Sequence, residues 1–424
     1  MSDPSTSLSD RRREEPEPVA VDFVLRLGRA LHSAGSSAQR LEDSVGALAD
    51  RLGLPEHHFF STPTSIMASF GPLGRQRTFM LRVEPGEVNL GRLAALEQIA
   101  LDVARGDTSP AAGSAAVRRI GEAPAPYGAA LTTLAYGVVS GAASQFLGGG
   151  IREVVVSATL GLGVGIVALL AGGHPRLGNV FQPLAAFLVS AACLGLAQVA
   201  GPVSVLTATL GGLIVLLPGL TLTVAMSELA TRNLASGTAR LSGAFIAFVA
   251  LAFGVALGNR VGTAAFGAAA ATVPLPLPGW SAFVAVVAAG LGFVVVLRAD
   301  PRDTPWIVVI GALGVLGGRA GAATLGVELG TFAGALAVGL ASGAYERLLH
   351  RPHAVVLVPG ILLLVPGSLG FQSLTSLMER EAVAGIETMF SMILTAMALV
   401  AGLLIAGVIA PEPRLSSSSL MNRG

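Results

Sequence analysis

The stretch GLIVLLPG at residues 212–219 is the most informative part of the sequence, because a near-copy of it, GILLLVPG, stands at residues 360–367. The two stretches lie 148 positions apart (360 − 212 = 148). Leucine and glycine are abundant in this chain, but proline and arginine are rare within its apolar sequence, so chance explains the match poorly. The chain therefore contains an internal repeat. The same offset of 148 relates two further pairs, Arg232 with Arg380 and Gly237 with Gly385.

The repeated stretches stand in strongly apolar surroundings. Of the 424 residues, 52% are hydrophobic and 12% are charged, and the mean hydropathy is +0.71. A soluble chain of this length could not bury so much apolar surface, so the region beyond about residue 127 is predicted to be a polytopic α-helical membrane domain. With about 20 apolar residues per span, ten spans are predicted, at 128–147, 154–172, 177–200, 203–225, 241–258, 280–297, 305–321, 323–344, 354–376 and 384–410.

The repeat divides these ten spans into two halves of five helices each. Because five is odd, the second half must enter the membrane from the opposite face, which gives an inverted-topology repeat, a design of secondary transporters. Each Pro-Gly is expected to interrupt its helix near the membrane midplane, since proline removes a backbone donor and glycine adopts unusual dihedral angles. The alternative is that each Pro-Gly is only a kink that helps packing.

The region before the membrane domain predicts a small α/β domain. Ser36 and Gln39 have the spacing of a capping box at a helix start, and residues 77–83 alternate as a strand does. Most arginines of the predicted loops fall on the side of this domain, so the domain and both termini are placed in the cytoplasm. The predicted organisation is a disordered lead at 1–19, the α/β domain at 20–126, the first membrane half at 127–258, an extracytoplasmic loop at 259–279, the second membrane half at 280–410 and a disordered tail at 411–424.

Short motifs occur in a fixed order: LGRALHSAG at 27–35 with RLE at 40–42, FSTPT at 60–64, LPG at 217–219 with SEL at 227–229, SGTARL at 236–241, and VPGS at 365–368. In order and spacing they resemble the bacterial threonine/serine exporter family. One departure is Glu228, where the family often has aspartate, so the carboxylate is kept with a longer reach. The resemblance implies export of threonine and serine coupled to the proton gradient, although some split-gene relatives are linked to dicarboxylate export.

All 27 basic residues are arginine, which is typical of a GC-rich bacterial genome, so the bacterial inner membrane is the expected location. The predicted substrate site lies at the paired Pro-Gly breaks, where freed carbonyls and half-helix ends could meet a zwitterionic or anionic solute. Polar groups nearby suit the carboxylate and ammonium of an amino acid. The predicted site residues are Pro218, Gly219, Thr221, Thr223, Pro366, Gly367, Ser368, Gln372 and Ser373.

Two carboxylates are the candidates for proton coupling, because ionisable groups within apolar segments are functional candidates by default. Glu228 follows the first Pro-Gly by nine residues, near the inner end of the predicted span 203–225, and is the leading candidate. The alternative is that Glu228 forms an interfacial ion pair with Arg232, four residues later. Glu328 opens the eighth predicted span, and Arg319 is its expected partner.

No cofactor and no metal are expected. His57 and His58 are adjacent and point apart on a strand, with no nearby cysteine to complete a metal site, and Cys193 is expected to be a packed core thiol. The glycine-rich stretches lack the Lys-Ser/Thr of a phosphate-binding loop, which disfavours ATP-driven transport. The net charge of +1 gives no argument for nucleic acid. The expected partners are an amino acid, protons and the lipid bilayer. A homo-oligomer stays open, as does a membrane-anchored sensor or enzyme that acts through the cytoplasmic domain.

Overall fold

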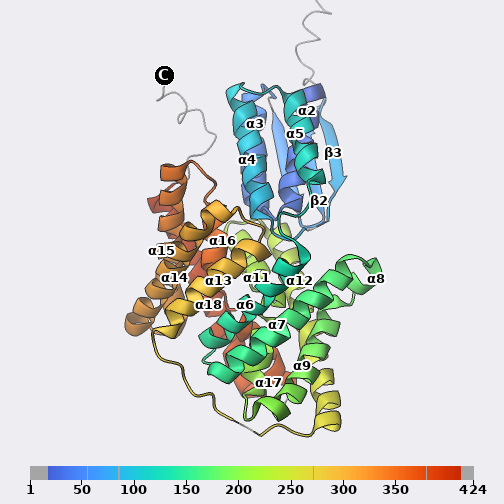
Figure 1. Cartoon of the computed structure of the whole chain (residues 1–424). Helices are drawn as coiled ribbons and strands as arrows, with labels where there is room; N and C mark the ends of the chain where they lie inside the picture. The colour runs from blue at the N-terminus through green and yellow to red at the C-terminus, as the bar shows by residue number, and fades with distance from the viewer. Residues whose placement is uncertain (1–17, 55, 85, 271, 379, 412–424) are drawn as a thin grey trace, which may run out of the picture.

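The computed structural model describes residues 18–411, except 55, 85, 271 and 379. The chain forms two units, an N-terminal unit of residues 18–122 and a helical unit of residues 129–409. Figure 1 shows the N-terminal unit standing on one end of the helical unit, while the connection after residue 266 runs around the opposite end. The predicted lead at 1–19 and tail at 411–424 lie outside the described residues, except at their inner ends.

The N-terminal unit combines helices with a three-stranded antiparallel sheet of strand order β1-β2-β3. Alternate residues of the central strand, Ile66, Ala68 and Phe70, are buried, as expected for a strand with one face on a core. Asn89 caps α4 by accepting a hydrogen bond from the backbone N–H of Arg92 at 3.0 Å. The elements are α2 (Pro18–Ser33), α3 (Ala38–Arg51), β1 (His57–Thr62), β2 (Ser65–Phe70), β3 (Arg77–Arg82), α4 (Leu90–Arg105) and α5 (Pro110–Glu122).

The helical unit contains the remaining elements. They are α6 (Ala129–Phe146), α7 (Ile151–Gly172), α8 (Pro175–Gly178), α9 (Phe181–Ala200), α10 (Val205–Leu213), η1 (Ile214–Leu216), α11 (Gly219–Ala230), α12 (Leu234–Phe266), α13 (Ser281–Val296), η2 (Pro301–Asp303), α14 (Thr304–Leu325), α15 (Val327–Leu349), α16 (Ala354–Leu362), α17 (Gly367–Met378) and α18 (Ala382–Ile409).

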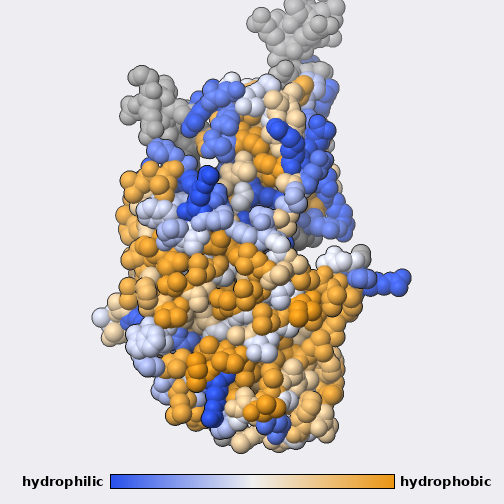
Figure 2. Space-filling model, viewed as in Figure 1, coloured by the Kyte–Doolittle hydropathy of each residue, from blue (hydrophilic) through white to orange (hydrophobic). Residues whose placement is uncertain are grey.

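By length and composition, this unit is a membrane domain. Among the described residues, seven helical segments are long and apolar enough to cross a membrane, and an eighth span results if α10 with η1 and α11 count as one bent pair. Figure 2 shows apolar surface over most of the helical unit and more polar surface over the N-terminal unit. The protein is therefore an α-helical polytopic membrane protein.

Helix α12 is longer than predicted, and it takes in the first part of the loop expected at 259–279. The helix ends at Phe266, eight positions beyond the predicted end (266 − 258 = 8). A Cβ on Gly258 would overlap the carbonyl oxygen of Phe187 on α9, so this glycine lets the two backbones approach closely. Packing against α9 therefore continues the helix through Arg260, whose charge suggested a loop.

The two Pro-Gly segments share the local structure that follows the motif, although the first is bent by 60° and the second continues α16 as one span. Helices α11 and α17 each have 12 residues and begin at the glycine of the motif. Arg232 and Arg380, which follow these helices, both have a positive φ, 66° and 67° respectively. A Cβ on Gly237 or Gly385 would lie 2.8 Å or 2.6 Å from Cγ of a leucine on the preceding helix. The sequence repeat thus corresponds to a repeated local structure.

Candidate functional site

The two Pro-Gly breaks lie against each other in the helical unit. A Cβ placed on Gly219 would lie 3.1 Å from Gly367 Cα, and one on Gly367 would lie 3.2 Å from Gly219 Cα. Contacts this short are tighter than nearly all real Cβ contacts, so a side chain at either position would force the helices apart. The fold therefore brings together the four residues Pro218, Gly219, Pro366 and Gly367, which are far apart in the sequence.

Both breaks are also helix starts. Helix α11 begins at Gly219 and α17 begins at Gly367, and the chain bends by 60° between the α10–η1 segment and α11. The first N–H groups of a helix have no partner inside the helix, and the helix dipole places partial positive charge at the same end. Two helix N-termini in contact therefore favour a negative group, such as a carboxylate, between or beside them.

The polar side chains predicted near the breaks fall into two groups. Thr223 Oγ1 donates to the Gly219 carbonyl at 3.1 Å and Ser373 Oγ donates to the Gly385 carbonyl at 2.7 Å, so these two buried hydroxyls are already satisfied. The other group is partly exposed and could reach a solute. Within the part of the chain that the structure describes, the predicted side chains without a hydrogen bond are those of Thr221, Ser368 and Gln372.

Glu228 lies away from the crossing, at the boundary between the two units. It is 2% exposed, and its carboxylate accepts from the backbone N–H of Ala38 at 2.9 Å and from Ser236 Oγ at 2.8 Å. Arg240 Nε, on α12, lies 3.1 Å from both carboxylate oxygens. The ion-pair partner is thus Arg240 instead of Arg232, because α11 ends two residues before Arg232 and the i, i+4 geometry is lost.

The capping box expected at Ser36 and Gln39 does not form. Helix α3 begins at Ala38, and Ser36 Oγ donates to the carbonyl of the adjacent Ser37 at 3.4 Å. The carboxylate of Glu228, 190 positions along the chain, instead accepts the first N–H of α3. A carboxylate suits this position because it meets both an unpaired donor and the positive end of the helix dipole.

A second polar contact joins the two units, and it is made by Arg40 of the RLE motif. Arg40, also in the first turn of α3, donates to both carboxylate oxygens of Glu97 at 3.0 and 3.1 Å, and its Nη1 lies 3.0 Å from His353 Nε2. A guanidinium has only donors, so His353 Nε2 must accept and its proton must sit on Nδ1. That N–H then donates to Glu346 on α15 at 3.0 Å.

Glu328, the second proton-coupling candidate, is partly buried at the start of α15. Its Oε1 accepts from Ser391 Oγ of α18 at 3.3 Å. The expected ion pair with Arg319 is not formed, since Arg319 is exposed on α14 while Glu328 faces α18. Among the described residues, this carboxylate has no cationic partner within 4.0 Å.

Two buried carboxylates were missed by the sequence reasoning, although each stands alone at the start of an apolar run. Glu153, in the first turn of α7, is 3% exposed and accepts from the backbone N–H of Ser204, just before α10, at 2.9 Å. Asp303, at the start of α14, is 1% exposed. Its carboxylate accepts from the Tyr345 hydroxyl at 2.7 Å and from Arg351, which lies just before α16, at 2.6 Å. In each half, a buried acid therefore connects the second helix (α7 or α14) to the segment just before the helix that the Pro-Gly interrupts (α10 or α16).

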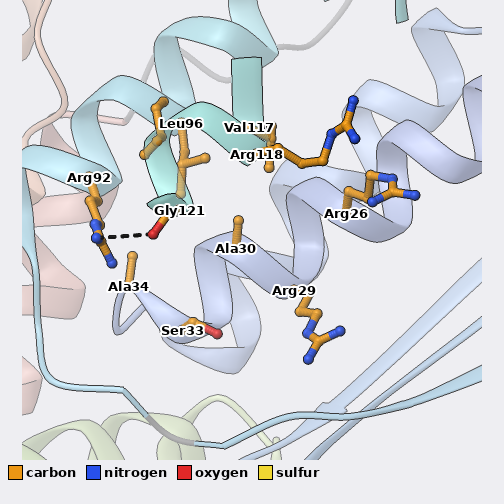
Figure 3. A pocket seen from close by; sticks show the side chains of 11 residues that line it. Arg26, Arg29, Ala30, Ser33, Ala34, Arg92, Leu96, Val117, Arg118 and Gly121 are labelled. Carbon is orange, nitrogen blue, oxygen red and sulfur yellow. Dashed lines mark hydrogen bonds between the residues drawn. The ribbon is translucent and has the colours of Figure 1, made fainter. Parts of the chain in front are cut away.

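The N-terminal unit has a hollow of about 340 Å³ between α2, α4 and α5. In Figure 3, the guanidinium groups of Arg26, Arg29 and Arg118 point outward around an apolar floor, and Arg92 donates to the Gly121 carbonyl at 3.2 Å. The hydrogen bond from Arg26 lowers the pKa of Asp22, which lies beside this hollow. The arginines do not converge on one point, so the hollow is no enzyme-like site. In the described ranges, no group of three or more His, Cys, Asp or Glu residues could hold a metal ion.

Comparisons with known proteins give one family over nearly the whole chain. The family described as "Putative threonine/serine exporter" matches residues 22–262, and the family described as "Threonine/Serine exporter, ThrE" matches residues 281–409. The protein named threonine/serine exporter in Corynebacterium glutamicum is 23% identical over 410 residues, which cover 93% of this chain and 83% of that protein.

Fungal proteins are similar as well. Pheromone-regulated membrane protein 10 of Eremothecium gossypii is 26% identical over 364 residues, which cover 83% of this chain and 48% of that protein. Its namesake in Zygosaccharomyces rouxii is 24% identical, with 83% of this chain and 37% of that protein covered. The chain thus spans half or less of the length of these fungal relatives. No solved structure matches the chain significantly.

Proposed function

Because the chain belongs to the threonine/serine exporter family, we propose that it is a secondary active transporter that exports small polar amino acids such as threonine and serine. The name of the Corynebacterium relative supports this class of cargo. Within the molecule, the observation that carries the proposal is the contact between two Pro-Gly breaks in apolar helices. Interrupted helices that meet inside a membrane domain are where secondary transporters bind their solutes.

The crossing has the chemistry that an amino acid requires. The N-termini of α11 and α17 would attract the carboxylate. The ammonium group and the side-chain hydroxyl would meet the hydroxyls of Thr221 and Ser368 and the amide oxygen of Gln372, which have no partner among the described residues. Leu217 and Val365 pack across the two glycines in the present conformation, so the solute needs a movement of the two helices to enter.

The proposed topology is ten spans in two inverted halves, with both termini in the cytoplasm of a bacterial cell and the N-terminal unit as a cytoplasmic domain. Helices α6 and α13, of 18 and 16 residues, are added to the eight spans to complete the ten. Helices α11 and α17 each extend for about 18 Å at 1.5 Å per residue, against a hydrocarbon core of about 30 Å. Both breaks would therefore lie near the midplane, as two inverted halves require.

Coupling to protons is part of the proposal, and Glu328 is its better candidate. Glu228 has an arginine and two further donors on its carboxylate, so this group is engaged in structural contacts. Glu328 has one hydroxyl donor at 3.3 Å and no ion pair among the described residues, which leaves its carboxylate available for coupling. We expect Glu328→Gln to remove the pH dependence of export, while Glu387→Gln, on an exposed position of α18, leaves it unchanged. Flux that keeps its full pH dependence in Glu328→Gln would exclude this role.

The decisive experiment is counterflow in proteoliposomes. Labelled threonine, serine and succinate are offered to the purified protein, with and without a pH gradient. The proposal expects exchange of threonine and serine, and loss of that exchange in Gly219→Ala. Absence of flux for all three solutes would overturn it. Exchange of succinate alone would support a dicarboxylate exporter, the second candidate, because two opposed helix N-termini could each take one carboxylate.

A further inference from the structure

We propose that helix α3 is a clamp that holds the cytoplasmic ends of the two membrane halves together, and that it must release the first half before solute can reach the crossing. The inference rests on the proposed transport function and assigns roles to residues that this function leaves unexplained. Two contacts define the clamp. Ala38 and Arg40, two residues apart in the first turn of α3, each bind one membrane half.

The contact with the first half is centred on Glu228. The carboxylate accepts the backbone N–H of Ala38, while Ser236 and Arg240 hold it from the membrane side. If α3 leaves, the buried charge keeps its ion pair and one of its hydrogen bonds, so opening does not strand an uncompensated carboxylate. This arrangement makes Glu228 suitable as a latch that can open repeatedly.

The contact with the second half is broader. Besides the path from Arg40 through His353 to Glu346, the backbone N–H groups of Leu90 and Gly91 donate to the carbonyls of Leu297 and Arg298 at 2.9 and 3.0 Å. A Cβ on Gly91 would lie 2.8 Å from the Arg298 carbonyl oxygen, so this contact requires glycine. Arg298 also pairs with Glu87 at 2.9 Å.

The asymmetry decides which contact opens. Among the described residues, the N-terminal unit is fixed to the second half by hydrogen bonds and an ion pair from α3, α4 and the segment before α4. Its hydrogen bonds to the first half converge on the Glu228 carboxylate, beside a packing contact between β1 and α12. The unit would therefore travel with the second half and separate from Glu228. Because Gly219 and Gly367 belong to opposite halves and touch, any opening of the crossing toward the cytoplasm must move these halves apart.

A cross-linking experiment tests the clamp in the full-length protein. Cys193, the sole cysteine, is first replaced by alanine. One double variant, Ala38→Cys with Ser236→Cys, places thiols on the two sides of the Glu228 latch. The matched control, Glu87→Cys with Arg298→Cys, places them across the contact with the second half. Each is treated with a short bismaleimide in proteoliposomes, and the untreated double variant serves as the reference for folding.

Cross-linking the latch is expected to lower threonine export about tenfold or more, and the control cross-link to change it less than about twofold, because only the first blocks the required movement. Amide hydrogen exchange at the starts of α11 and α17 gives a second readout that needs no cargo. The rate of amide hydrogen exchange should fall after cross-linking the latch and rise in Ala38→Pro. The proline removes the N–H that donates to Glu228, at the first position of a helix, where proline is tolerated. Ala129→Pro, at the start of α6, is the matched proline control.

The outcomes separate the clamp from the proposed cargo. Unchanged threonine export together with unchanged amide hydrogen exchange after cross-linking the latch would overturn the clamp. If the protein transports none of the amino acids but amide hydrogen exchange still responds to the latch, the clamp stands and the proposed function falls. If the protein transports none of the amino acids and amide hydrogen exchange does not respond to the latch either, both are overturned.

Discussion

Single glycines control how closely the two membrane halves approach. Gly219 and Gly367 face each other across the crossing: a methyl group on Gly219 would overlap Val365, and one on Gly367 would need its neighbours to shift by a few tenths of an ångström. The same chain has glycines with open space around them, such as Gly243 on α12, where nothing lies within 4 Å of an added Cβ. The steric role of glycine therefore depends on its position: Gly258, like the glycines of the crossing, lies at a close contact between helices, whereas Gly243 does not.

Gly219→Ala should abolish export while the protein still inserts and folds. The added methyl group would collide with Val365 and Gly367, and overpacking of this kind costs about 1–3 kcal/mol. Gly243→Ala is the matched control, expected to be near-neutral or slightly stabilising, because alanine is the better helix former by roughly 0.5–1 kcal/mol. The measurement is threonine counterflow at equal amounts of inserted protein. Normal flux in Gly219→Ala would show that the crossing does not need its close packing.

Helix starts in this protein are set by tertiary contacts as much as by local sequence. The start of α4 follows the sequence rule, because Asn89 caps it locally and Gly91 then docks on the membrane unit. The start of α3 does not, because a carboxylate from α11 replaces the local capping box. Both starts face the helical unit, so capping and docking share the same backbone groups.

Asn89→Ala should destabilise the N-terminal unit and loosen its docking. The asparagine is 5% exposed and accepts from the Arg92 N–H at 3.0 Å, and loss of such a cap costs about 1 kcal/mol. Ser109→Ala removes the cap of α5, which is longer, at 3.3 Å, and exposed, so its effect should be smaller. Thermal unfolding of the detergent-purified protein compares the two. An equal loss of stability in both variants would contradict a special role for the docked helix start.

The membrane domain could be predicted from the sequence because of its long apolar runs, and the internal repeat because proline and arginine are rare enough in those runs to mark it. The bounds of α12 could not, since they depend on how a glycine packs against α9. The partner of Glu228 could not either, because Arg240 lies beyond a turn and Ala38 lies in the other unit. The contact of Arg40 with His353 spans 313 positions, and nothing in the sequence marks His353 as the partner of the arginine in the RLE motif.

The proposed inverted repeat makes a prediction about the whole molecule that no single helix could make. Ala230 and Met378 end α11 and α17, are both exposed and lie 148 positions apart (378 − 230 = 148). In a direct repeat, equivalent positions would face the same side of the membrane. In an inverted repeat they must face opposite sides, Ala230 toward the cytoplasm with the N-terminal unit and Met378 away from it.

Single cysteines at these two positions, introduced into Cys193→Ala, should therefore react from opposite sides with a membrane-impermeant maleimide. Met378→Cys should be labelled in intact cells, and Ala230→Cys only after the cytoplasmic face is opened. Gly279→Cys in the loop before α13 and Gly178→Cys in α8 are the controls for the two faces, since both positions are exposed and leave open space for a side chain. Labelling of both test positions from one side, with the controls on opposite sides, would rule out the inverted arrangement and with it the midplane meeting of the two breaks.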